Sequence, residues 1–132
     1  MPVTLDVADD VLSRVHIGNV HRRETQIGVL RYCGRRNARF GYSESALHNM
    51  HNVGECRACV DHKRHPSGGD TLPYFAVDFG WKVLTEQPAV MRELRDIWRI
   101  AARGENVTLL CWCAPAPCHT LIIKRHLREL AT

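Results

Sequence analysis

The sequence has no apolar run that approaches the roughly 20 residues needed to cross a bilayer. Residues 1–14 contain neither the basic start nor the apolar stretch of a secretion signal. We therefore expect a cytoplasmic protein. Internal repeats and low-complexity tracts are also missing, which excludes a repeat array. In a reducing compartment, the six cysteines are expected to be thiols, metal ligands or catalytic groups rather than disulfides.

Length and composition fit one folded domain. The chain has 132 residues, of which 45% are hydrophobic and 24% charged. These values are ordinary for a globular protein and exclude a wholly disordered chain, a collagen and a disulfide-stabilised miniprotein. We therefore expect a single domain over residues 1–132 with one hydrophobic core.

The positive charge is concentrated in the middle of the chain. The net charge is +4, and residues 21–65 carry nine basic and four acidic side chains together with five of the eight histidines. Such a field favours an anionic partner, either a nucleotide, a phosphate or a nucleic acid. A solvated arginine-rich surface explains the same excess equally well.

Short apolar runs alternate with longer amphipathic segments. The expected strands are 11–17, 26–33 and 107–113, and the expected helices are 44–51, 70–85, 88–103 and 118–130. This order predicts a small single-domain α/β fold, Rossmann-like, with a largely parallel sheet and flanking helices. The remaining polar segment includes a long irregular basic loop insert at 50–69.

Two loops are expected to meet at one edge of this sheet. Segments 34–49 and 113–119 each follow an apolar strand. Parallel strands end at the same edge, and ligands of α/β sheets bind beyond the carboxyl ends of the strands. We therefore expect both loops to border one crevice.

The run CWCAPAPCH at 111–119 is the sharpest local feature. A proline before Cys118 suits the first turn of a helix, whose free amides and dipole attract anions and lower a cysteine pKa. Cys118 is therefore a candidate nucleophile, and His119 a candidate acid, base or metal ligand. Cys111, inside an apolar strand, fits a buried small hydrophobe as well as it fits a ligand contact.

A second cluster lies in the insert, where Cys56-x2-Cys59 is followed by His62 and His65. Cys-x2-Cys is the usual spacing of half a zinc site, and a metal would brace the long loop. The His-x2-His spacing is one residue shorter than the common one, so incidental cysteines in a basic loop are the alternative. A mixed site, in which Cys113, Cys118 or His119 joins Cys56 and Cys59, is a further alternative that the spacing does not decide.

The third feature is Gly34-Arg35, directly after the expected strand 26–33, with Ser45 and Asn49 downstream. A glycine allows close backbone approach to a ligand, and an arginine can hold a phosphate or carboxylate with two hydrogen bonds. Glycine and arginine after a strand also occur for purely structural reasons.

The run from Leu110 to His119 resembles the C-terminal signature of the family called domain of unknown function 4326, L-x-C-W-C-x-P-x-x-C-H. The Gly34-Arg35 turn and the Ser45…Asn49 segment are similar to that family's second signature. Met50-His51 stand where the family has Pro-Phe, and the Cys56–Gly69 segment is not part of its pattern. A shorter similarity links Cys118-His119 to domain of unknown function 488, with Thr120 in place of an arginine.

The resemblance implies a small α/β domain of bacterial or phage origin and a shared site, without a known reaction. The expected ligand-binding and catalytic residues are Gly34, Arg35, Ser45, Asn49, Cys111, Cys113, Cys118 and His119. We expect a small nucleotide- or nucleoside-binding enzyme that catalyses hydrolysis or glycosyl transfer. The alternative is a non-catalytic zinc-binding module that contacts nucleic acid or a host protein.

Overall fold

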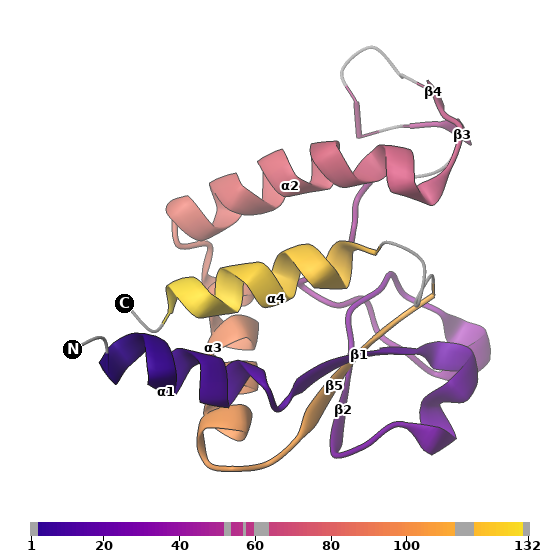
Figure 1. Ribbon diagram of the computed structural model, residues 1–132. Coiled ribbons are helices and arrows are strands. Elements are labelled where there is room, and N and C mark those ends of the chain that lie inside the picture. Colours follow the sequence, from indigo (N-terminus) through magenta and orange to yellow (C-terminus); the bar gives the residue numbers. More distant parts are fainter. Residues whose placement is uncertain (1–2, 52–53, 57, 60–63, 113–117, 131–132) are drawn as a thin grey trace.

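A three-stranded parallel sheet in the order β1-β5-β2 forms the centre of the fold (Figure 1). The computed structural model describes residues 3–51, 54–56, 58–59, 64–112 and 118–130. The strands are β1 (Val15–Asn19), β2 (Val29–Tyr32) and β5 (Val107–Cys111). Val107 lies opposite Val15 on one side and opposite Val29 on the other. Every residue of β5 is buried, as its unbroken apolar sequence predicts.

Helices flank this sheet and supply most of the core. The helices are α1 (Val3–Leu12), α2 (Gly68–Leu84), α3 (Pro88–Ala102) and α4 (His119–Glu129), with 3-10 turns η1 (Val20–Thr25) and η2 (Ala38–Phe40). Figure 1 shows α4 running between α1 and α2. Large side chains fully buried in this core include Phe75, Phe79, Leu94, Ile97, Leu109, Ile123 and Leu127. The small α/β fold expected from the sequence is therefore confirmed.

The N-terminal segment differs from its expected structure. Residues 11 and 12 end helix α1, and the strand begins only at Val15, so the strand predicted at 11–17 is partly wrong. Ala8, Val11 and Leu12 are all buried. Their spacing of three and four residues is that of a helix face, a signal stronger than the imperfect alternation of 11–17.

No helix forms at 44–51, where a short one was expected. The Ser45 hydroxyl accepts a hydrogen bond from the Leu47 amide at 3.0 Å. Such a local turn gives the backbone an alternative to helical hydrogen bonds. The nearby helical turn is instead η2, which is capped by the Asn37 side chain as it accepts a hydrogen bond from the Phe40 amide.

The insert contains a small two-stranded sheet. Strand β3 (Gly54–Glu55) pairs antiparallel with β4 (Arg64–His65), so that Gly54 lies opposite His65. Figure 1 shows this pair beside the start of α2, away from the main sheet. Within the described part of the chain, no helix combines the length and the apolar character that a membrane crossing demands.

Candidate metal centre and the adjoining pocket

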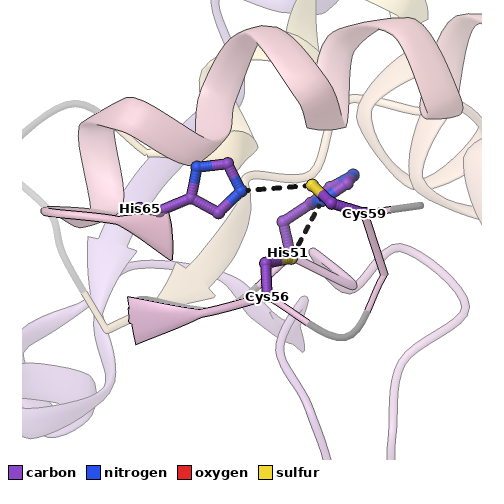
Figure 2. Close-up of side chains that lie close together, drawn as sticks. All are labelled: His51, Cys56, Cys59 and His65. Atoms are coloured by element: carbon purple, nitrogen blue, oxygen red, sulfur yellow. Dashed lines mark hydrogen bonds between the residues drawn. The ribbon is translucent and has the colours of Figure 1, made fainter. Parts of the chain in front are cut away.

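Four side chains of the insert region converge in what we call the His/Cys cluster: His51, Cys56, Cys59 and His65 (Figure 2). One ligand atom from each lies within 4.8 Å of all the others. Three of the four residues are buried, and Cys59 is half-buried. This group could hold a metal ion.

The separations inside the cluster agree with a tetrahedral site. His51 Nδ1 lies 3.3 Å from Cys56 Sγ and 3.5 Å from Cys59 Sγ, and His65 Nε2 lies 3.4 Å from Cys59 Sγ. Bond lengths of about 2.3 Å to sulfur and 2.0–2.1 Å to nitrogen give tetrahedral sulfur–nitrogen edges of about 3.5 Å. Three of the six separations among the ligand atoms therefore match the edges of a site for one small, tetrahedrally bound metal.

Two carboxylates on helix α2 orient the two imidazoles. His51 donates its Nε2 hydrogen to Asp78 at 2.5 Å, and His65 donates its Nδ1 hydrogen to Asp70 at 2.6 Å. The opposite nitrogen of each ring is thereby left to face the sulfurs. Carboxylate partners of this kind fix the tautomer and raise the basicity of metal-binding histidines. The hydrogen bond with Asp70 accordingly raises the pKa of His65.

The backbone brings these residues together through a turn and a helix start. Gly54 adopts a φ of +86°, which glycine tolerates and other residues rarely adopt. The antiparallel pairing of Gly54 with His65 brings His65 close to Cys56. Ser67 then caps α2 by accepting a hydrogen bond from the Asp70 amide. This cap sets the Asp70 carboxylate beside the ring of His65.

Three of the four expected metal ligands, Cys56, Cys59 and His65, lie in the cluster, and His62 falls outside the described residues. Sequence reasoning missed His51, which stands five residues before Cys56. A signal for it existed, because Met50-His51 is where this chain departs from the Pro-Phe of the family signature. Asp70 and Asp78 gave no such signal, since carboxylates on a helix face are common.

A pocket of about 330 Å³, the edge pocket, lies beside the cluster. Its lining residues come from the ends of β2 and β5, from the loops that follow β2, and from the start of α4: Tyr32, Gly34, Arg35, Arg36, Asn37, Asn49, His51, Trp112 and His119. His51 therefore belongs to both the pocket and the cluster. The structure thus brings Gly34, Arg35, Asn49 and His119 around one cavity at the carboxyl edge of the sheet.

Hydrogen bonds connect the arginine side of the edge pocket to the cluster. Arg35 Nε donates to the Asn49 carbonyl at 3.0 Å. The Asn49 side chain accepts from the His51 amide at 3.0 Å and donates to the Thr71 hydroxyl at 2.9 Å. Asn49 thus ties the Gly34-Arg35 turn, the cluster and helix α2 together, in a structural role additional to any ligand contact.

Aromatic side chains form another wall of the edge pocket. The Trp112 indole donates to the Tyr32 hydroxyl at 2.9 Å, and this hydroxyl donates to the Arg35 carbonyl at 2.5 Å. The ring of Tyr32 stacks on that of Tyr42 with centroids 4.2 Å apart. The wall is consequently held in place by both hydrogen bonds and ring contacts.

Cys118 and His119 are in contact, and His119 is the one of the two that lines the edge pocket. His119 donates its Nε2 hydrogen to the Cys33 carbonyl at 2.5 Å, so the unprotonated Nδ1 faces Cys118 Sγ at 3.4 Å. Burial lowers the pKa of His119, which keeps the imidazole neutral at pH 7. Cys118 itself is 1% exposed and is not among the residues that line the edge pocket.

The remaining sequence candidates lie elsewhere. Ser45 donates its amide hydrogen to the Gly34 carbonyl at 3.0 Å, and its side chain is used by the local turn. Cys111 is fully buried in β5 and accepts a hydrogen bond from Thr120 at 3.8 Å. Among the described residues, neither Ser45 nor Cys111 lines the edge pocket. Cys113 falls outside the described residues.

A larger hollow of about 730 Å³ lies along α3. Its lining mixes acidic and basic side chains: Glu86, Pro88, Met91, Arg92, Glu93, Arg95, Asp96 and Arg99. No aromatic ring, cysteine or histidine is among these residues. Gly34, Arg35, Asn49 and His119 line the edge pocket instead, and Cys56, Cys59 and His65 belong to the His/Cys cluster.

Fold and site together define a small α/β domain with a potential metal centre beside a pocket at the sheet edge. The family model described as Domain of unknown function (DUF4326) matches residues 18–129, and the chain belongs to this family. The resemblance to domain of unknown function 4326 is thereby confirmed. No curated protein and no solved structure matches the chain significantly.

Proposed function

We propose that the protein binds a nucleotide or a nucleoside phosphate in the edge pocket, beside a structural zinc ion held by the His/Cys cluster. The observation that carries the first part is the combination of side chains around one cavity. Arg35 and Arg36 offer guanidinium groups for phosphate, Tyr32 and Trp112 offer aromatic surface for a base, and Asn37 offers an amide. Pockets for small ligands pair apolar surface with a few polar groups in this way.

The second part of the proposal rests on the donor set. Two thiolates and two imidazoles suit zinc, and a site with four protein ligands is of the closed, structural kind. The metal would fix His51, and through it Asn49 and the Gly34-Arg35 turn. Zinc binding requires reduced cysteines, so the proposal includes the cytoplasm as the working compartment.

The ligand is tested by titration calorimetry with the four ribonucleoside 5′-monophosphates and the matching nucleosides. We expect at least one monophosphate to bind more tightly than its nucleoside. Arg36→Ala should weaken that binding by roughly tenfold or more, because a hydrogen bond to a charged group is worth about 1.5–3 kcal/mol. Arg95→Ala, at an exposed arginine of α3, serves as the matched control. Absence of binding by any monophosphate would refute the first part.

The metal is tested by elemental analysis of the purified protein. We expect one zinc ion per chain in the wild type and its loss in Cys56→Ser, because an alcohol is a poor zinc ligand. Cys111→Ser, at a buried cysteine outside the cluster, is the matched control. Equal zinc content in all three proteins would refute the zinc assignment.

The hydrolytic or glycosyl-transfer reaction expected from the sequence stays a prediction. Cys118 is buried and both nitrogens of His119 have partners within the protein, so these contacts favour a binding function over a cysteine nucleophile. The reaction is tested by product analysis of every nucleotide that binds, with wild type and Cys118→Ser. Turnover that disappears in Cys118→Ser, with unchanged nucleotide affinity, would assign the reaction to this residue.

A further inference from the structure

An arginine-bearing aromatic surface lies next to the edge pocket. The Arg23 and Arg39 guanidinium carbons stand 5.0 and 5.9 Å from the centroid of the Phe40 ring. The Phe40 ring in turn contacts His21 and Trp112, with centroids 5.9 and 5.3 Å apart. We call these five residues the outer ring surface. Cation–π contacts hold its two arginines at the protein surface.

Trp112 makes this surface continuous with the edge pocket. Its ring lines the pocket and also contacts the rings of Phe40 and His21, each with centroids 5.3 Å apart. A ligand that leaves the pocket along Trp112 therefore reaches Phe40 and its two arginines next. Residues of η1 and η2 meet here with Trp112, which follows β5 much later in the sequence.

The charge exceeds what a mononucleotide needs. Arg35 and Arg36 line the edge pocket, whereas Arg23 and Arg39 do not. A single phosphate is satisfied by one or two guanidinium groups, so two further cations beside aromatic rings match additional phosphates and bases. Single-stranded nucleic acids are bound in this manner, by a basic surface that follows the backbone and by rings that contact unpaired bases.

We propose, on the basis of the proposed nucleotide pocket, that the ligand is a single-stranded nucleic acid. One of its nucleotides occupies the edge pocket, while neighbouring phosphates and bases lie on the outer ring surface. A duplex is a poorer match because its stacked, paired bases do not expose their faces to protein aromatic rings.

The test is fluorescence anisotropy of the zinc-loaded protein with a labelled ten-nucleotide oligothymidylate and oligouridylate, in parallel with mononucleotide calorimetry. We expect at least one oligonucleotide to bind tenfold or more tightly than its mononucleotide. Arg23→Gln/Arg39→Gln should weaken oligonucleotide binding at least tenfold and leave mononucleotide affinity within twofold. The slope of log K against log salt should fall by about 1.4, or 0.7 for each lost phosphate contact. Arg95→Gln/Arg99→Gln on α3 is the matched control.

The outcomes separate this inference from the pocket proposal. Mononucleotide binding with no tighter oligonucleotide binding overturns the single-strand inference and leaves the pocket proposal standing. A duplex bound as tightly as the single strand also overturns it. If neither ligand binds, both proposals fail. If only the oligonucleotide binds, the mononucleotide proposal fails and Arg36→Ala tests the single-strand inference. An unchanged oligonucleotide affinity in Arg36→Ala then overturns the placement of one nucleotide in the edge pocket. Far-ultraviolet circular dichroism checks that each variant is folded.

Discussion

The Asp78 carboxylate accepts a hydrogen bond from His51 Nε2 at 2.5 Å, and this contact turns His51 Nδ1 towards the two cysteine sulfurs. The same ring also lines the edge pocket. A carboxylate on helix α2 therefore sets the orientation of a side chain shared by the candidate metal centre and the pocket. The effect of Asp78 on metal affinity is directly measurable.

Replacing Asp78 with Asn should weaken zinc binding by roughly 10- to 100-fold, because loss of a carboxylate partner lowers the basicity and the order of a histidine ligand. The affinity is measured by competition with a chromophoric chelator. Asp10→Asn, at an exposed carboxylate of α1, should leave it unchanged. An Asp78→Asn protein with wild-type zinc affinity would show that the charge of the Asp78 carboxylate does not strengthen zinc binding through His51.

Much of the fold could be predicted from the pattern of apolar residues in the sequence. β5, α3 and α4 lie within two residues of their expected positions, because each has a strong strand or helix period. The N-terminal helix was missed because the imperfect alternation of residues 11–17 was followed instead of the helical spacing of Ala8, Val11 and Leu12. The turn at Ser45 was missed because its side-chain hydrogen bond competes with the helix and has no periodic signature.

The candidate site could be predicted only in part from the sequence. Parallel strands predicted that Arg35 and His119 share a sheet edge, and both line the edge pocket. Cys56 and Cys59 were found through their spacing, but His51 was not, because a ligand from outside the short motif depends on how the chain folds back. Asp70 and Asp78 approach the cluster only through the packing of α2, which local spacing does not encode.

Removal of the metal should loosen the insert and leave the sheet folded. The four cluster residues do not belong to the main hydrophobic core, which is built from the helices and β5. We expect zinc at 100 times its Kd to stabilise the protein by about 2.7 kcal/mol. Hydrogen exchange with and without chelator should show faster exchange in residues 51–65 and unchanged protection in β5. Lost protection in β5 would mean that the metal holds the whole fold.

Acidification should destabilise the protein through His119. Burial lowers the pKa of His119 below its ordinary value of 6.5. As the pH falls below about 6.5, the unfolded chain therefore takes up this proton before the folded one, and the free energy of unfolding decreases. His119→Gln retains a donor for the Cys33 carbonyl and should flatten this dependence. Urea unfolding between pH 7.5 and 5.5, with chelator present to exclude metal release, gives the free energy of unfolding of wild type and His119→Gln. An equal change of this free energy with pH in the two proteins would contradict the prediction.

The rate of thiol alkylation should increase with the solvent exposure of each cysteine. Among the described cysteines, Cys59 is half-buried and the others are buried, and burial raises the pKa of Cys33. In chelator-treated protein we expect iodoacetamide to modify Cys59 first, and zinc to slow that reaction. Peptide mass spectrometry after partial labelling identifies the site. Faster labelling of Cys118 at pH 7 would instead support the thiolate at a helix start that the sequence suggests.

Gly34 should be needed for the shape of the aromatic wall. A Cβ atom at Gly34 would lie 2.5 Å from the Tyr32 hydroxyl oxygen and 2.6 Å from the ring carbon that bears it. Gly34→Ala must therefore move the Tyr32 side chain, whose hydroxyl accepts the Trp112 hydrogen bond. Overpacking of this kind costs about 1–3 kcal/mol of stability, and a displaced Tyr32 should also weaken nucleotide binding.

Gly80 offers a matched comparison, because nothing lies within 4 Å of the Cβ atom it would gain. Gly80→Ala lies inside helix α2 and should stabilise the protein by about 1 kcal/mol. Urea unfolding of both variants measures the contrast. Tyr32→Leu should then relieve Gly34→Ala, since it removes the hydroxyl and the ring that the new methyl group meets. If Gly34→Ala costs the same free energy in the Tyr32→Leu background as in the wild type, the contact with Tyr32 is not the cause of its effect.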